Sequence, residues 1–220
     1  MSRSIIITAG GIGARMGNEI PKQFMLLGHK PVLIHTLEIF HEFDQSAQII
    51  ITLPSHWVAY WKELLVEFNV NIAHEIVDGG TERFHSVQNA ITLCKGEQIA
   101  IHDGVRPLVS KNTIGRCFEA LDLAPAVVPV LSMKDSLRVG SYVNSKNVDR
   151  SSYFLVHTPQ CFNASILKKA YQQSFKADFT DDASVVEAFG IKPILIESNE
   201  ENIKITSALD LKILNAFLLK

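Results

Sequence analysis

The sequence predicts an α/β fold in which a mostly parallel, twisted sheet is flanked by helices. Three observations lead to this prediction. Strand-like apolar runs alternate with segments of helical periodicity along most of the 220 residues, which is typical of βαβ units. Two of the strand-like runs end in glycine-rich loops, and parallel sheets commonly bind ligands beyond such strand ends. The alternation is interrupted once, between residues 132 and 157.

The composition limits what the chain can bind. Hydrophobic residues make up 47% of the sequence and charged residues 20%, which suits the core of one domain over residues 1–220. The formal net charge of −2 provides no basic field for a nucleic acid or an anionic membrane. No apolar run reaches membrane-spanning length. The first strand begins within a few residues, without a basic segment and a long apolar stretch before it, so we expect no signal peptide. We expect a small-molecule partner and a cytoplasmic location.

The three cysteines, Cys94, Cys117 and Cys161, are widely spaced and form no C-x-x-C pair. This pattern indicates neither a disulfide framework nor a zinc site, and it suits a reducing compartment.

The first glycine-rich segment spans residues 9–17, AGGIGARMG, and follows the apolar run 5–7. Glycine lets the backbone approach a ligand closely, and successive N–H groups of such a loop can bind an anion. Arg15 and Lys22 add two cations, so the segment favours a polyphosphate. The dinucleotide fingerprint fails because Met16 stands at its third glycine, and the P-loop pattern fails because no Gly-Lys-Ser/Thr follows.

The other elements follow from hydrophobic periodicity and from helix and strand boundaries, with Pro31 placed to open a helix and Pro54 to end a strand. Strands are expected over residues 5–7, 48–53, 71–77, 98–101, 126–131 and 191–196. Helices are expected over residues 31–40, 57–68, 112–123 and 164–175, with others that end near 94, start within 179–182 and start at 207.

Two more segments follow expected strands. The second glycine loop, DGGTERFHS at 78–86, follows the strand 71–77, and Asp103 follows the strand 98–101. Because the carboxyl ends of parallel strands open to one crevice, both should lie beside the first loop. Asp103 is therefore a candidate Mg²⁺ ligand. The alternative is that Asp103 caps the following turn and pairs with Arg106.

Residues 132–157 carry polar, strand-like patches joined by turn residues at Gly140 and Ser141. We interpret them as a projecting β-hairpin arm, a subdomain within the single domain. A lone two-stranded hairpin is marginal in water, so the arm should pack on something, most simply a second subunit. The sequence thus predicts a homodimer formed through the arm.

Together these segments resemble one family over essentially the whole chain, the 2-C-methyl-D-erythritol 4-phosphate cytidylyltransferases of the non-mevalonate isoprenoid pathway. The glycine loop is shared with ribitol-5-phosphate cytidylyltransferases, whereas Val148-Asp149-Arg150 is more discriminating. The other matching segments are 9–16, 21–23, 77–80 with Arg83 and Ser86, 102–103 with 106–107, 134–136, 158–160, 180–181 and 202–206. The departures are Gly10 and Gly104 where alanine is usual, Thr81 where an acidic residue is frequent, and Ser136 for threonine.

The resemblance implies a Rossmann-like nucleotidyltransferase fold that transfers CMP from CTP to a polyol phosphate, with Mg²⁺ or another divalent cation as cofactor. The acceptor phosphate is already a nucleophile, so no protein base is needed. By resemblance, the catalytic residues are Arg15 and Lys22. The nucleotide-binding residues are Ala9, Gly10, Gly11, Gly13, Gly80, Thr81, Arg83, Ser86 and Gly104. The residues for methylerythritol phosphate are Asp103, which is also the metal ligand, Arg106, Ser136, Arg150, Thr158, Thr180 and Lys204.

Two alternatives stay open at this point. The near one is a cytidylyltransferase for ribitol 5-phosphate or another polyol phosphate. The far one is a nucleotide-binding regulatory protein without turnover, which would be expected to lose its cations or its metal carboxylate. Arg15, Lys22 and Asp103 are all present.

Overall fold

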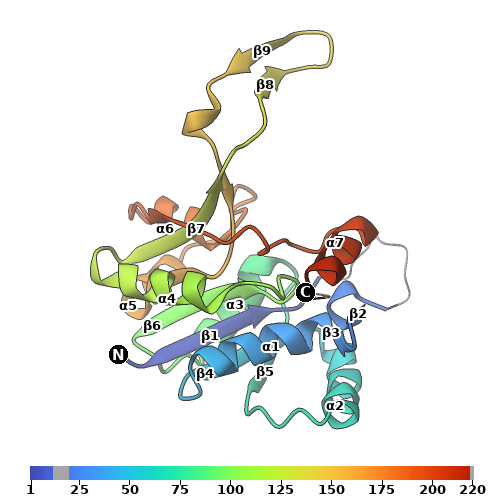
Figure 1. Cartoon of the computed structure of the whole chain (residues 1–220). Helices are drawn as coiled ribbons and strands as arrows, with labels where there is room; N and C mark the ends of the chain where they lie inside the picture. The colour runs from blue at the N-terminus through green and yellow to red at the C-terminus, as the bar shows by residue number, and fades with distance from the viewer. Residues whose placement is uncertain (12–19, 219–220) are drawn as a thin grey trace.

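The computed structural model describes residues 1–11 and 20–218. These residues form an eight-stranded mixed sheet with helices on both faces and a long hairpin that projects away from it (Figure 1). The strand order is β10-β7-β11-β6-β1-β4-β5, and β12 also pairs with β7. The expected α/β fold with a mostly parallel sheet and a projecting arm is confirmed.

The strands of the main sheet are β1 (Arg3–Thr8), β4 (Gln48–Leu53), β5 (Glu75–Asp78), β6 (Gln98–Asp103), β7 (Ala126–Ser132), β10 (Phe154–Val156), β11 (Gln160–Asn163) and β12 (Ile194–Glu197). Two short pairs are β2 (Leu26–Leu27) with β3 (Lys30–Pro31) and β8 (Leu137–Gly140) with β9 (Ser145–Val148). The helices are α1 (Val32–Phe43), α2 (Val58–Glu67), α3 (Arg83–Ile91), α4 (Lys111–Glu119), α5 (Ala164–Ala170), α6 (Asp182–Ala188) and α7 (Ala208–Leu218). Short 3-10 turns are η1 (Lys22–Phe24), η2 (Ser55–Trp57), η3 (Ala120–Asp122) and η4 (Arg150–Ser152).

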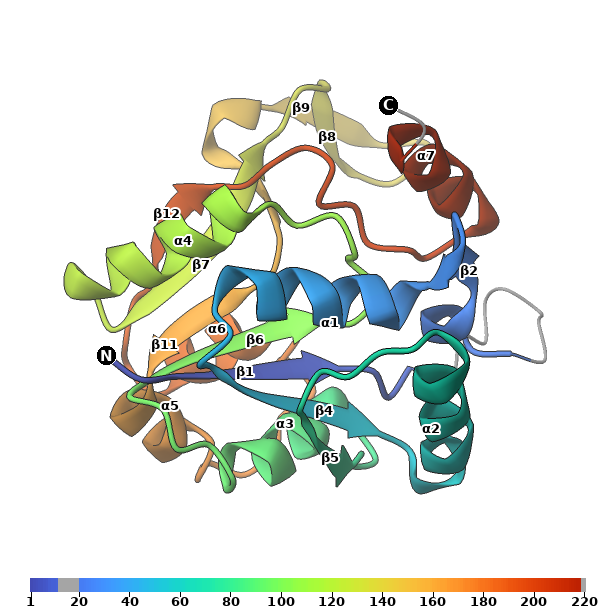
Figure 2. The same ribbon diagram turned by 60° about the horizontal axis from the view of Figure 1, so that its bottom comes forward.

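The register of the central strands brings their carboxyl ends to one edge of the sheet. Thr8 of β1 lies opposite Thr52 of β4 on one side and Asp103 of β6 on the other, in parallel pairing. Strand β5 extends this parallel part beyond β4, and the arrows of β1, β4 and β6 point the same way in Figure 2. The loops that follow these strands therefore begin side by side, as the sequence predicts.

The core has two layers because the central strands are apolar on both faces, as buried parallel strands usually are. Ile5 and Ile7 pack in a cluster with α1, α2 and α4, including Phe40 and Trp61. Ile6 packs on the opposite face with residues of α3, α5 and α6, such as Val186. Burial of these side chains stabilises the sheet, whose strand ends carry the loops.

Several element boundaries differ from the sequence-based expectation. The strand expected over 71–77 begins only at Glu75, and the helix expected over 164–175 ends at Ala170. Strand β11 was not expected, because Gln160 and Asn163 give it a polar appearance. Gln160 is nevertheless fully buried, since its amide donates to Asp181 (2.7 Å) and accepts from the Ala183 N–H (2.8 Å).

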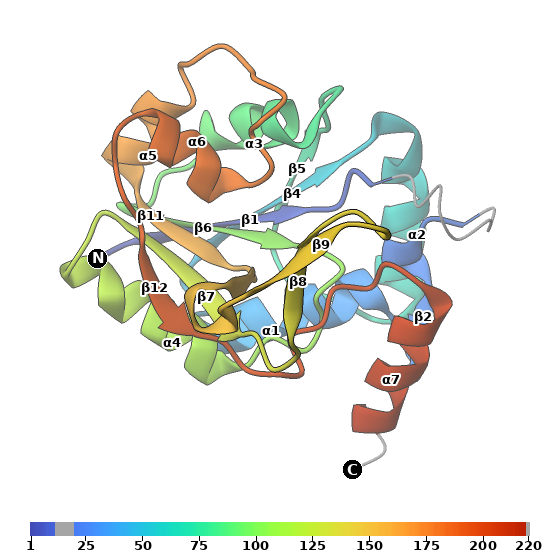
Figure 3. The ribbon, with the colours of Figure 1, turned by 90° about the horizontal axis from the view of Figure 1, so that it is seen from above.

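The arm is an antiparallel hairpin of β8 and β9, with Leu137 opposite Val148 and Gly140 opposite Ser145. The chain then returns to the sheet as β10, which pairs with β7. Figure 1 shows the arm projecting beyond the sheet and its helices, and from above in Figure 3 it overlies the middle of the molecule.

None of the helices among the described residues has both the length and the apolar character needed to cross a membrane. The three cysteines are buried, and none of them forms a disulfide, as expected.

Candidate functional site

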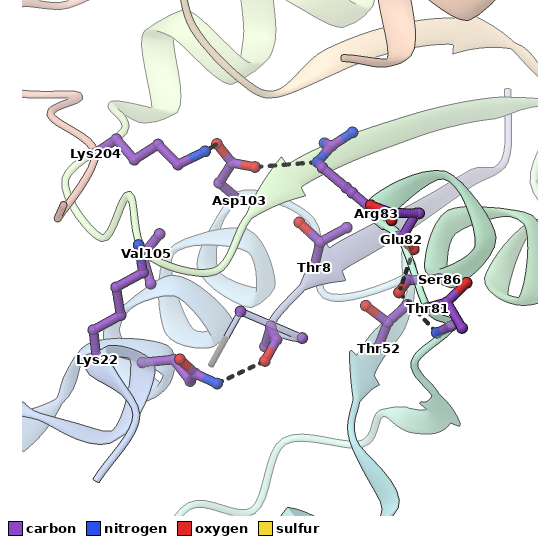
Figure 4. Close-up of a pocket in the computed structure, with 15 residues that line it drawn as sticks. Thr8, Lys22, Thr52, Thr81, Glu82, Arg83, Ser86, Asp103, Val105 and Lys204 are labelled. Atoms are coloured by element: carbon purple, nitrogen blue, oxygen red, sulfur yellow. Dashed lines mark hydrogen bonds and ion pairs between the residues drawn. The ribbon is translucent and has the colours of Figure 1, made fainter. Parts of the chain in front are cut away.

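A first pocket lies at the carboxyl ends of β1, β4 and β6, between residues 9–11 of the first glycine loop and the second glycine loop (Figure 4). Its lining combines backbone-rich loop residues with a few charged side chains, so it offers both N–H donors and cations. The described lining residues are Thr8, Ala9, Gly10, Gly11, Lys22, Gln23, Thr52, Gly80, Thr81, Glu82, Arg83, Ser86, Asp103, Val105 and Lys204.

The second glycine loop is held by the start of α3. The Gly80 N–H donates to Ser86 Oγ (2.9 Å), and Ser86 Oγ donates to the Glu82 carbonyl (3.2 Å). A Cβ at Gly80 would lie 2.3 Å from His85 Cβ, so only glycine allows this turn. The serine hydroxyl thus shapes the loop and keeps one lone pair for a ligand.

Gln23 plays the corresponding role at the first loop. Its buried side chain donates from Nε2 to the Ala9 carbonyl (2.7 Å), just beyond the end of β1. The adjacent Lys22 then enters the first pocket. Gln23 was part of the sequence motif but was not counted among the candidate site residues.

A second pocket adjoins the first and shares Arg83, Asp103 and Lys204 with it. It lies between β6, the β10–β11 connection and the start of α6, so it is built mainly from side chains. The described lining residues are Arg83, Asp103, Arg106, Val156, His157, Thr158, Gln160, Thr180, Asp181 and Lys204.

The two pockets meet at a group that we call the Asp103 cluster, which consists of Asp103, Arg83, Arg106 and Lys204. Asp103 Oδ2 lies 3.0 Å from Lys204 Nζ and 3.3 Å from Arg106 Nε, and Oδ1 lies 3.5 Å from Arg83 Nε. Burial raises the pKa of the Asp103 carboxyl, but the three cations lower that pKa by more, so the group is held as a carboxylate. One buried carboxylate therefore lies in contact with three cations.

His102 lies directly behind Asp103 and is neutral. Thr158 Oγ1 accepts from the Asp103 N–H (3.1 Å) and pairs with His102 Nδ1 (3.0 Å), and His102 Nε2 pairs with the Arg106 carbonyl (3.0 Å). Burial is the main cause that lowers the pKa of His102 to about 4. The hydroxyl of Thr158 must then donate to Nδ1, so its remaining capacity toward a ligand is one lone pair.

The residues present fit a metal ion only in a limited way. Among residues 1–11 and 20–218, no group of three His, Cys, Asp or Glu side chains could hold one. Asp103 is a single carboxylate whose two oxygens both face cations. This donor set fits a Mg²⁺ ion that is held mostly by phosphate oxygens and water, with Asp103 as one ligand at most. The ion pair with Arg106 that the alternative interpretation gave to Asp103 is also present (3.3 Å). The following turn is closed by the Arg106 N–H, which donates to the Asp103 backbone carbonyl (3.0 Å) and not to its side chain.

Most candidate residues in the described part of the chain converge on these pockets, with three exceptions. Ser136 and Arg150 of the arm are outside the described linings, and Arg150 Nη1 donates to the Lys134 carbonyl. Gly104 is not among the described lining residues of either pocket. Its N–H donates to the Thr8 carbonyl (2.9 Å), and its carbonyl accepts from the Thr36 hydroxyl (3.1 Å). The remaining two candidates, Gly13 and Arg15, lie outside the described residues.

Sequence reasoning missed Asp182. Both of its oxygens accept from Arg83, at 2.8 and 2.7 Å, and its side chain is fully buried. The only sequence signal is an acidic pair, Asp181 and Asp182, at the expected helix start, where a capping role is the ordinary interpretation. Asp181 does form that cap, whereas Asp182 faces inward.

Comparisons with known proteins agree with this geometry. The family model described as IspD, 2-C-methyl-D-erythritol 4-phosphate cytidylyltransferase, matches residues 4–220. The protein of that name from Bacteroides fragilis is 50% identical over 219 residues, which is 99% of this chain and all of the relative. The one from Phocaeicola vulgatus is 49% identical, over 97% of this chain and 98% of the relative.

Solved structures are similar over the full length. The 2-C-methyl-D-erythritol 4-phosphate cytidylyltransferase of Thermus thermophilus has a TM-score of 0.82 at 28% identity, with 100% of each chain covered. The 4-diphosphocytidyl-2C-methyl-D-erythritol synthase of Anaerococcus prevotii has a TM-score of 0.84 at 26% identity, with 100% of this chain and 96% of that chain covered.

Proposed function

Since the chain belongs to the 2-C-methyl-D-erythritol 4-phosphate cytidylyltransferase family, we propose that its two adjoining pockets bind the two substrates of that reaction. The enzyme transfers CMP from CTP to 2-C-methyl-D-erythritol 4-phosphate and releases pyrophosphate, which gives 4-diphosphocytidyl-2-C-methylerythritol in the non-mevalonate isoprenoid pathway. The observation that carries this assignment to the site is the Asp103 cluster, since three of its four residues, Arg83, Asp103 and Lys204, line both pockets.

In this arrangement the first pocket binds CTP. The backbone of Ala9, Gly10 and Gly11 faces the triphosphate, while Gly80, Thr81 and Ser86 face the base and ribose. Lys22 lines the same pocket, with its side chain directed toward Val105 in Figure 4. A preorganised cation of this kind stabilises the charge on the oxygens around the α-phosphorus during an in-line displacement. Arg15 is proposed for the same task on the grounds of its sequence motif.

The second pocket binds the acceptor. Its phosphate oxygen attacks the α-phosphorus without a protein base, so the chain needs only to bring two anions together. Lys204 and Arg106 supply the positive charge, and Thr158 and Thr180 add hydroxyl groups at the wall. Asp103 pairs with both cations, and Arg106 also donates from Nη1 to the Asn202 carbonyl (2.8 Å). The carboxylate and the backbone together hold the positive charge at the pocket.

A divalent cation completes the proposal. When bound, Mg²⁺ neutralises phosphate charge and orients the triphosphate, and Asp103 is the residue that would hold it. The fit described above makes CTP the main source of its ligands. The enzyme should accordingly show a requirement for a divalent cation that rises with nucleotide concentration.

The arm is proposed to form a homodimer and to complete the neighbour's site with Ser136 and Arg150. Apolar side chains at its tip and base, including Tyr142, Val143 and Phe154, are exposed in the single chain. An exposed surface of this kind favours a partner. A cytoplasmic location stays a prediction as well.

A pyrophosphate-release assay tests the function. Each of the four nucleoside triphosphates is combined with 2-C-methyl-D-erythritol 4-phosphate or ribitol 5-phosphate, with and without Mg²⁺. We expect turnover with CTP and the methylerythritol acceptor. A preference for ribitol 5-phosphate would support the near alternative, and nucleotide binding without turnover in any combination would support a regulatory protein.

A further inference from the structure

Arg83 links the second glycine loop to the start of α6. It is the first residue of α3, directly after the second glycine loop, and its guanidinium reaches the first residue of α6, Asp182. Nη1 and Nη2 donate to the two oxygens of Asp182 at 2.8 and 2.7 Å, while Nε faces Asp103 at 3.5 Å. Helices α3, α5 and α6 lie on the same face of the sheet (Figure 3). One side chain thus spans the boundary between the pockets.

Asp182 contacts Arg83 from the interior of the protein. Its side chain is fully buried, and it is not among the described residues that line either pocket. The Tyr171 hydroxyl donates to the same Oδ1 at 2.6 Å, and the Tyr171 ring stacks on Phe84, with 4.8 Å between centroids. A buried carboxylate without these donors would be strongly unfavourable, so Asp182 fixes where the guanidinium can lie.

The geometry of Arg83 decides how Asp103 is shared. A bidentate pair is the strongest arrangement for a guanidinium and a carboxylate, and Asp182 occupies the fork of Arg83. Only the longer Nε contact is left for Asp103, which keeps Lys204 at 3.0 Å on its other oxygen. Without the Asp182 charge, the fork of Arg83 could turn onto Asp103 and displace Lys204.

We propose that Asp182 is a positioning residue for the transfer reaction. It holds Arg83 at the boundary of the two pockets, so that Asp103 orients Lys204 and Arg106 toward the acceptor phosphate. This inference rests on the proposed function and adds to it a residue that touches neither substrate. Its effect is on the acceptor and on the rate, because the backbone contacts of the glycine loops do not depend on Asp182.

The test is a double-mutant cycle of Asp182→Asn and Arg83→Gln. Each single variant should lower kcat/KM for the acceptor about tenfold. In Asp182→Asn, whose substituted residue lines neither pocket, the Kd of CTP, measured by calorimetry, should change by less than about threefold. The double variant should be no slower than Arg83→Gln alone, since Asp182 acts only through Arg83. Asp44→Asn is the matched control. It breaks an Arg–Asp pair (Arg3 to Asp44, 2.9 Å) at the opposite end of β1, and it should lower stability with unchanged kcat and KM.

Three results would overturn the inference: an acceptor kcat/KM of Asp182→Asn equal to wild type, equal loss of CTP and acceptor binding, or additive losses in the double variant. If Asp182→Asn does not fold, Tyr171→Phe replaces it. That variant keeps the ring stack and the Arg83 pair, and we expect a two- to threefold loss in acceptor kcat/KM, so an unchanged value would count against the proposal.

Failure of the proposed function would look different. A wild-type enzyme without turnover would reject that function directly. The positioning role is then read from binding of 2-C-methyl-D-erythritol 4-phosphate in the presence of the α,β-methylene analogue of CTP. Weaker acceptor binding in Asp182→Asn, with analogue binding retained, would support the inference, and unchanged acceptor binding would overturn it.

Discussion

Two regions expected to bind the acceptor, the Asp103 cluster and the arm at residues 132–157, differ in burial and in their contacts. Asp103 is 7% exposed and faces three cations of its own chain. Arg150 of the arm is exposed, and the described contact of its guanidinium is with a backbone carbonyl of the arm itself. The cluster is therefore arranged within one chain, whereas the arm presents its arginine outward.

The difference has a physical cause. Buried charges must be paired where they lie, so a cluster that shapes a site is complete in the single subunit. An exposed arginine on a hairpin has no such constraint, and it acquires a fixed position only against another surface. The Asp103 cluster is therefore arranged before a second subunit binds. The part of the site that includes Arg150 would be completed by a second subunit.

The largest expected effect comes from breaking the cluster. Asp103→Asn is nearly isosteric but removes the charge that pairs with three cations, and it also removes the proposed metal carboxylate. We expect Mg²⁺-dependent turnover to fall on the order of 10³-fold, measured by pyrophosphate release. Circular dichroism checks that the variant is folded. Full activity in a folded variant would remove Asp103 from both roles.

Lys22→Ala should have the next largest effect. Its charge is assigned to the transition state, so kcat should fall on the order of 10²-fold and more than the affinity for CTP. Lys30→Ala is the matched control, because Lys30 pairs with Glu38 (2.7 Å) on a half-exposed surface away from the pockets. A raised KM with unchanged kcat would mean that Lys22 only binds the nucleotide.

The arm prediction sharpens the comparison most directly. If Arg150 serves the neighbouring site, Lys22→Ala and Arg150→Ala subunits should regain activity when mixed and allowed to exchange. Random exchange makes half of the dimers hybrids, each with one intact site, so about a quarter of wild-type activity should return. A mixture that demonstrably exchanges subunits yet stays inactive would place Arg150 in its own subunit's site.

The parts of the site that could be predicted are those that a residue type determines locally. Gly80 is an example, because its turn leaves no space for a Cβ, and the requirement is visible in the sequence. The Arg83 to Asp182 pair could not be predicted, since its partners are 99 residues apart in the chain. Their proximity depends on how α3 and α6 pack on the sheet.

Strand β11 illustrates the same limit for the fold. Periodicity predicts a buried strand when the residues of the strand are apolar. It therefore predicted the central strands, such as β1 with its apolar run Ile5–Ile7. Gln160 is buried because its amide is satisfied by Asp181 and Ala183. Those partners come from a different element, so hydrophobicity alone could not reveal the strand.

Lowering the pH should reduce the free energy of unfolding through two buried histidines, His102 and His157. Burial is the main cause that lowers the pKa of His102 and of His157 to about 4 each, below the unfolded value of about 6.5. The unfolded chain then binds more protons between these values, so stability falls as pH decreases through this window. Urea unfolding from pH 6.5 to 5.5 should show a loss of about 1 kcal/mol per histidine. Burial lowers the pKa of His74 as well, so His157→Gln should remove only its own share of the loss, about 1 kcal/mol. A pH-independent stability would contradict the buried neutral state.

The smallest effect is expected at Gly104, which distinguishes packing from ligand contact. An alanine Cβ would lie 2.9 Å from Leu33 Cδ1 and 3.1 Å from the Thr8 carbonyl, so Leu33 must shift. Both backbone hydrogen bonds of Gly104 survive the change, and alanine is the usual residue here in the family that the sequence resembles. Gly104→Ala should therefore lower stability by about 1 kcal/mol, with kcat and the KM of CTP within about twofold of wild type. Thermal unfolding and steady-state kinetics measure the two quantities. A tenfold higher KM of CTP in a folded variant would mean that Gly104 contacts the nucleotide, as its assignment to nucleotide binding implies.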